Sequence, residues 1–79
     1  MKSNRERYRD MLILLNIKQG ESAKLLHSVT RRPCSVRTVR SWLNDPDKPS
    51  SRPCPDWAVE GLEYAVGVMQ RAMSKRAEN

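Results

Sequence analysis

The side chains in this sequence that could do the most specific chemistry lie in one short polar and basic segment, residues 35–44. Arg37 and Arg40 are three positions apart, so they share a face if the segment is helical. A guanidinium group can donate two hydrogen bonds to guanine O6 and N7, or it can bind a phosphate. The pattern therefore predicts a helix that contacts bases in the DNA major groove. The predicted base contacts are Arg37, Arg40, Ser41 and Thr38.

The same segment carries an apolar side and a helix-start signal. Ser35 is a favourable N-cap residue. The apolar positions that fall on one side of the predicted helix are Val36, Val39, Trp42 and Leu43. An apolar back and an arginine-bearing front are what a helix in the major groove requires. The alternative is a surface helix whose arginines are simply solvated.

Other polar and basic residues are candidates for holding the DNA backbone. Pro33 disfavours a helical conformation at the residue before it, so Arg31 and Arg32 are expected on a connector, as phosphate contacts or as ordinary exposed charge. Residues 44–55 contain four of the five prolines and are predicted to form a loop. The predicted backbone contacts are Ser35, Gln19, Arg31, Arg32, Arg52 and Lys48.

The composition favours a small single domain with a polyanionic partner. The chain has 79 residues, 38% of them apolar, and 15 Lys and Arg against 9 Asp and Glu. Residues 1–55 carry a net charge of +7 and residues 56–79 a net charge of −1. This asymmetry indicates a binding part and a packing part. The alternative is that the basic residues serve only solubility.

Helical spacing of apolar residues recurs along the chain and predicts an all-α fold, a small bundle of about four helices. Ser3 and Glu6 form a capping-box pattern before a helix over about 4–16. A second helix is expected over about 21–29, with Gly20 in its first turn. The segment 35–44 gives the third helix, and the fourth spans about 56–74.

The last helix has two adjacent apolar stripes, although one would close a small core. The second stripe favours packing against a second copy of the chain, and a domain of this size gains stability from dimerisation. The alternative is that one chain buries both stripes. The predicted dimer contacts are Trp57, Leu62, Tyr64, Val66, Met69 and Met73.

The sequence offers little for catalysis or metal binding. It has no Ser/His/Asp or Cys/His grouping, no phosphate-binding loop and no acidic cluster, so we expect no enzyme and no cofactor. One histidine and the distant Cys34 and Cys54 make a poor zinc set, so no metal is expected. So small a core also predicts no cavity for a small-molecule effector.

The compartment follows from apolar runs and cysteine usage. The charged start MKSNRERYRD lacks the apolar core of a secretory signal. The longest apolar run, Met11–Leu15, is far shorter than the roughly 18 residues of a membrane span. We therefore expect no membrane association, and reduced thiols in the cytoplasm of a bacterial host cell.

The middle of the chain resembles a helix-turn-helix of the Cro and phage-repressor type. The matching positions are Gln19, Ala23, Leu25, Leu26, Ser35, Thr38, Val39 and Trp42. The resemblance implies that residues 1–79 form one helix-turn-helix DNA-binding domain with a dimerisation helix at about 56–74. The chain departs from the family in its turn. Ala23 and Val39 are sixteen positions apart rather than about ten, and the usual turn glycine is missing.

A second pattern, Arg52-Pro-x-Pro-x-Trp57-Ala-Val-x-x-Leu62-Glu, is similar to a segment of small anti-CRISPR-associated repressors of phages. The resemblance implies a homodimer that binds an inverted repeat in a promoter and represses an operon of a phage or mobile element, such as an anti-CRISPR operon. The alternative is a small phage protein that inhibits or assembles with a host nucleic-acid-binding protein complex. Two arginines on one exposed helix face favour DNA.

Overall fold

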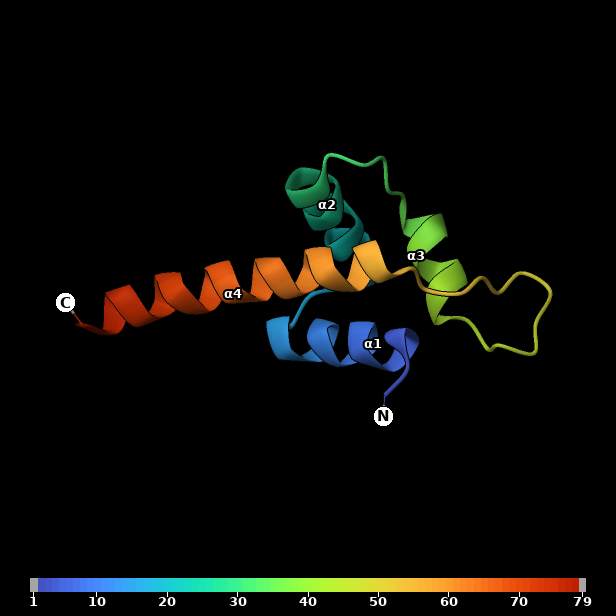
Figure 1. Cartoon of the computed structure of the whole chain (residues 1–79), viewed down its shortest axis with the longest axis horizontal. Helices are drawn as coiled ribbons and strands as arrows, with labels where there is room; N and C mark the ends of the chain where they lie inside the picture. Colours follow the sequence, from blue (N-terminus) through green and yellow to red (C-terminus); the bar gives the residue numbers. More distant parts are fainter. Residues whose placement is uncertain (1, 79) are drawn as a thin grey trace.

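Four α-helices make up the computed structural model, which describes residues 2–78 and the side chains of residues 2–72. The helices are α1 (Asn4–Leu15), α2 (Gln19–Thr30), α3 (Val36–Leu43) and α4 (Asp56–Glu78) (Figure 1). No strand occurs in this part of the chain. The predicted all-α fold of about four helices is confirmed.

Local capping signals set the helix ends. The Ser3 hydroxyl accepts a hydrogen bond from the backbone N–H of Glu6 at 3.3 Å at the start of α1. The Ser35 hydroxyl accepts one from the N–H of Thr38 at 3.2 Å at the start of α3. The predicted end of the last helix near residue 74 is wrong, because α4 continues to Glu78. Its last turns contain Lys, Arg, Ala and Glu, which favour helix.

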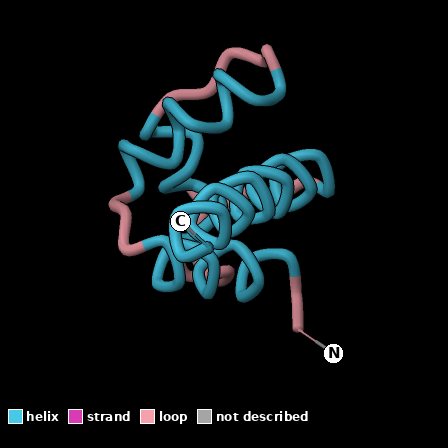
Figure 2. Tube along the Cα trace, turned by 90° about the vertical axis from the view of Figure 1, so that its left-hand side faces the viewer, coloured by secondary structure: helices cyan, strands magenta, loops and turns pink. Residues whose placement is uncertain are grey.

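The longest helix, α4, is the element around which the others assemble. α1 and α2 both pack against α4, while α3 packs against α2 and, less extensively, against α1. Figure 2 looks nearly along α4 and shows the other helices around it. The C-terminal half of α4 projects beyond the rest of the molecule (Figure 1), which is 50 Å long but only 28 Å by 19 Å across. Among the described residues, no other helix therefore lies beside the projecting half of α4.

Aromatic rings connect three of the helices in the core. Trp42 of α3 makes edge-to-face contacts with Tyr8 of α1 and Trp57 of α4, at centroid distances of 5.8 Å and 5.7 Å. The Tyr8 hydroxyl donates a 2.8 Å hydrogen bond to the hydroxyl of Ser22 on α2. Burial raises the pKa of Tyr8 to about 12, so the phenol stays protonated as a donor near neutral pH. These contacts fix the buried side of α3.

The connector between α2 and α3 shows how the chain accommodates the long spacing of sixteen positions between Ala23 and Val39. α2 extends to Thr30, and residues 31–35 then lead to α3, so the extra residues lie in both the helix and the connector. Arg31 has a φ of 63°, and its N–H donates to the carbonyl of His27 at 2.9 Å. Arg31 thus adopts the left-handed conformation that glycine usually takes at the end of a helix.

Replacing Arg31 with glycine should raise the free energy of unfolding by about 1 kcal/mol, because a side chain in the left-handed region is strained and glycine is not. Urea unfolding followed by circular dichroism measures the change. Asn16, with a φ of 55°, is the matched control. Asparagine tolerates this conformation, so Asn16→Gly should leave stability nearly unchanged. Equal effects at both positions would contradict strain at Arg31.

Candidate nucleic-acid interface

The solvent-facing side of α3 carries the basic residues predicted to contact DNA. Val39, Trp42 and Leu43 are buried in the core, which turns Arg37 and Arg40 outward into solvent. Hydrogen bonds at both ends hold the helix in this orientation. The Ser35 cap fixes its start, and the Arg9 guanidinium of α1 donates to the carbonyl of Leu43 at its end. The helix therefore presents the arginines to solvent as the sequence predicts, but Val36, which was predicted on the apolar side, is 37% exposed.

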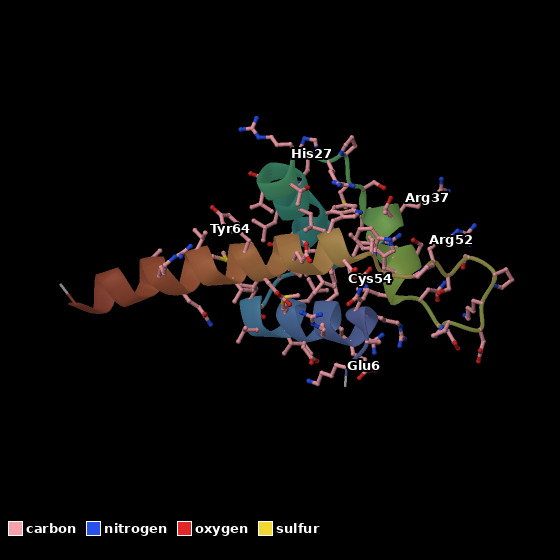
Figure 3. The ribbon with its side chains drawn as sticks, in the orientation of Figure 1. Glu6, His27, Arg37, Arg52, Cys54 and Tyr64 are labelled. Carbon is pink, nitrogen blue, oxygen red and sulfur yellow. The ribbon has the colours of Figure 1, made fainter. Side chains whose placement is uncertain are left out.

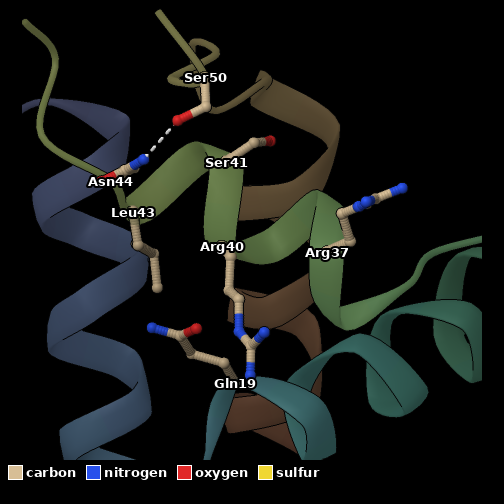
Figure 4. A pocket seen from close by; sticks show the side chains of 7 residues that line it. All are labelled: Gln19, Arg37, Arg40, Ser41, Leu43, Asn44 and Ser50. Carbon is tan, nitrogen blue, oxygen red and sulfur yellow. Dashed lines mark hydrogen bonds between the residues drawn. The ribbon is translucent and has the colours of Figure 1, made fainter. Parts of the chain in front are cut away.

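A shallow hollow of about 570 Å³ lies along this face (Figure 4). Arg40 extends from α3 toward Gln19 at the start of α2, while Arg37 points away from the body of the protein. The hollow thus brings together predicted contacts from α2 and α3. Its lining residues are Gln19, Arg37, Arg40, Ser41, Leu43, Asn44 and Ser50.

The arginines of α3 are electrostatically available. Among the described residues, the two ion pairs are Lys2–Asp10 and Arg7–Glu63, and both involve α1 rather than α3. Neither Arg37 nor Arg40 pairs with a carboxylate in this part of the chain. Because no described carboxylate pairs with these guanidinium groups, they can bind phosphates or base acceptors directly.

The hydroxyl groups of α3 have partly used their hydrogen-bonding capacity. The Ser41 hydroxyl donates to the carbonyl of Thr38 at 2.6 Å, so it remains free only to accept. Ser41 can therefore accept a hydrogen bond from the exocyclic amine of cytosine or adenine. The hydroxyl oxygens of Ser35 and Thr38 are 3.1 Å apart at the helix start and share a hydrogen bond. Both Ser35 and Thr38 are exposed and keep a free acceptor position.

The two connector arginines do not line the hollow. The Arg32 guanidinium lies over the ring of Trp57 at 4.9 Å from its centroid, a cation–π contact within the protein. Arg31 is exposed and ends α2. Sequence reasoning missed this packing role of Arg32, because Trp57 lies far along the chain and only the fold brings the two together.

The proline-rich loop lies against the end of α3. The N–H of Arg52 donates to the carbonyl of Ser41 at 2.9 Å, and the side-chain amide of Asn44 donates to the hydroxyl of Ser50 at 2.8 Å. These bonds fix Arg52 relative to α3, and Figure 3 shows Arg37 and Arg52 at the end of the molecule opposite the free end of α4. Lys48 is exposed on the same loop. Ser50, which also lines the hollow on α3, was not among the contacts predicted from the sequence.

Two of the predicted dimer contacts belong to the core of the single chain. Leu62 is completely buried and Val66 is 9% exposed, so neither is free to contact a second copy, and these two assignments are wrong. Trp57 is half-buried between Trp42 and Arg32. Leu62 and Val66 are buried because both α1 and α2 pack against α4.

The remaining predicted dimer contacts differ. Tyr64 is 61% exposed and Met69 is 42% exposed, and Val68 between them is exposed to a similar extent. The side chain of Met73 lies outside the described residues. An apolar surface therefore remains on α4, and it contains two residues of the predicted set, Tyr64 and Met69, together with Val68. We call Tyr64, Val68 and Met69 the α4 patch.

The described residues contain no group of three or more His, Cys, Asp or Glu side chains that could hold a metal ion. Cys34 and Cys54 are free thiols, and burial raises the pKa of both, that of Cys54 to about 11. Both sulfurs are therefore protonated near neutral pH and weak as nucleophiles. No helix in the described part of the chain combines the length and apolar character needed to cross a bilayer.

Comparison with known proteins returned no relative for this chain. No protein-family model, no curated protein sequence and no solved structure matches it. The functional assignment therefore depends on the chain's own residues, above all on the exposed face of α3 and the elements that hold it.

Proposed function

We propose that the protein is a sequence-specific double-stranded DNA-binding repressor that acts as a homodimer on an inverted-repeat operator. The observation that carries the proposal is the exposed pair Arg37 and Arg40, which form no ion pair with a described carboxylate, on a short helix anchored in the core by buried side chains. In this proposal α2, the connector and α3 form a helix-turn-helix, and α3 enters the major groove.

In the proposed complex, Arg37 and Arg40 donate to guanine acceptors, and each bidentate pair discriminates by about 1–3 kcal/mol. Arg40 lies beside Gln19, so the start of α2 is placed to meet the adjacent phosphate. Arg52 and Lys48 approach the backbone from the loop. Repression then needs no chemistry, because an occupied promoter excludes the polymerase. The resemblance to anti-CRISPR-associated repressors favours an operon of a phage or mobile element.

The α4 patch supports the homodimer. Asn4 of α1 donates to the carboxylate of Asp56, and Arg7 pairs with Glu63, so α1 and α4 run side by side in the same direction. α1 ends at Leu15, and the second half of α4 continues alone (Figure 1). Tyr64 and Val68 are four positions apart and share a face of this helix, and Met69 follows Val68, so the exposed apolar side chains lie together along it.

Substituting Val68 and Met69 together with glutamate should convert the protein to a monomer, because charges in an apolar helix interface cost several kcal/mol to bury. Sedimentation equilibrium measures the mass. The control is Gln70→Glu, which changes the charge at a neighbouring exposed position and should leave the dimer intact. A wild-type protein that is monomeric at micromolar concentration would refute the homodimer.

A salt series of gel shifts tests the DNA proposal. Wild-type protein should bind short duplex DNA with an affinity that falls steeply as salt rises, because arginines that bind phosphates displace counterions from the DNA. Arg37→Ala should weaken binding, whereas Arg71→Ala, which removes the same charge from an exposed position on α4, should not. No binding to duplex DNA at low salt would refute the proposal and favour a protein partner instead.

A further inference from the structure

A second cleft, of about 450 Å³, lies between the start of α1, the end of α3 and the proline-rich loop. Two arginine side chains line it, Arg5 on α1 and Arg52 on the loop, and the Arg52 guanidinium donates to the carbonyls of Pro49 and Ser51 at 3.1 Å. None of the described residues that line it is acidic. The lining residues are Ser3, Asn4, Arg5, Trp42, Pro46, Ser51, Arg52, Pro53 and Cys54.

Arg5 is electrostatically uncompensated within the protein. Its Nε atom is buried without a hydrogen-bond partner, and its guanidinium forms no ion pair with a described carboxylate. Arg5 is also the second residue of α1, where the helix dipole disfavours a positive charge. A buried donor without a partner and an unfavourably placed charge both cost stability. An anion bound in the cleft would offset the unfavourably placed charge.

Hydrogen bonds hold the cleft in a fixed position relative to α3. The side-chain amide of Asn4 donates to the carbonyl of Cys54 at 3.0 Å and to the carboxylate of Asp56 at 2.8 Å, which joins the start of α1 to the end of the loop. The N–H of Arg52 bonds to Ser41 on α3. The two arginines therefore approach any ligand of α3 as part of a pre-organised surface.

We propose that this cleft binds a backbone phosphate of DNA, beside the groove that α3 would enter, and that Arg5 is a phosphate contact. Ser50 lines the hollow on α3 and Ser51, the next residue, lines the cleft, so the two sites adjoin at the loop. A duplex held by Arg37 and Arg40 would place its backbone along this loop. The inference rests on the proposed DNA binding and adds a contact outside the helix-turn-helix.

The test compares Arg5→Ala with Arg7→Ala, which removes the same charge two positions away on α1, from a side chain already paired with Glu63. Binding to a random-sequence DNA duplex is measured by fluorescence anisotropy over a range of salt. Arg5→Ala should lower the slope of log affinity against log salt by about 0.9 and weaken binding about fivefold at 0.15 M salt. Arg7→Ala should change neither quantity. Thermal unfolding of both variants checks that they are folded.

Equal salt slopes for the wild type and Arg5→Ala would overturn the phosphate contact while leaving the DNA proposal intact. A wild-type protein that binds no duplex would overturn the DNA proposal itself. Inorganic phosphate, added alone and followed through the fluorescence of Trp42 in a Trp57→Phe background, distinguishes a free-anion site. A response at micromolar phosphate that Arg5→Ala abolishes would show that the cleft is a site for a free anion and contradict a backbone contact.

Discussion

Replacing Gly61 with valine should lower the free energy of unfolding by at least about 3 kcal/mol, because α2 and α4 meet at this residue and overpacking there forces the helices apart. A Cβ atom at Gly61 would lie 2.7 Å from Cγ2 of Thr30 and 3.0 Å from Cδ2 of Leu26. Even alanine should destabilise, although it gains about 1 kcal/mol of helix propensity over glycine. Urea unfolding at equilibrium measures both variants.

Gly67 provides the matched control on the same helix. A Cβ atom at Gly67 would meet no other atom within 4 Å, so Gly67→Ala should raise the free energy of unfolding by about 1 kcal/mol through helix propensity alone. The two glycine-to-alanine substitutions are thus expected to have opposite signs. If Gly61→Ala also stabilised the protein, the close approach of α2 and α4 would be contradicted.

Arg40→Ala should remove most of the preference of the protein for its operator over random DNA. Loss of one bidentate guanine contact costs about 1–3 kcal/mol, which is about a 5- to 150-fold decrease in the ratio of specific to non-specific affinity. Arg37→Ala should have an effect of similar size at a different base pair. Competition binding with selected and random duplexes measures the ratio.

A charge-preserving variant separates base recognition from general attraction to DNA. Arg40→Lys keeps the positive charge but loses the planar pair of donors. It should therefore retain non-specific affinity and its salt dependence while losing most of the preference. If Arg40→Lys and the wild type had the same preference, Arg40 would be a phosphate contact rather than a base contact.

The elements of this fold were predictable from the sequence because their signals are local. Ser3 and Ser35 begin helices as their types indicate, and the prolines of residues 44–55 exclude helix there. The sequence did not predict which element packs against each face of α4. Leu62 and the neighbouring Gly61 are both buried, Leu62 in the core and Gly61 against α2. Apolar spacing identifies a buried face but not what covers it.

Some residues of the candidate site could likewise be predicted from the sequence, and others could not. Arg37 and Arg40 could be found from the sequence because both lie on one helix with a clear apolar back. Arg5 and Ser50 could not, because their places depend on how the start of α1 and the long loop fold around α3. Arg32 was predicted as part of the site but packs within the protein instead. Its charge predicted a phosphate contact, but the guanidinium lies on the ring of Trp57.

Selection of bound duplexes from a random-sequence DNA pool, followed by sequencing, tests sequence-specific binding most directly. We expect enrichment of an inverted repeat whose half-sites contain guanines and are centred about one helical turn, roughly 10 base pairs, apart. The Arg37→Ala, Arg40→Ala double variant should enrich no such motif. A wild-type pool that remains as random as the input, or a motif that survives in the double variant, would contradict sequence-specific binding through α3.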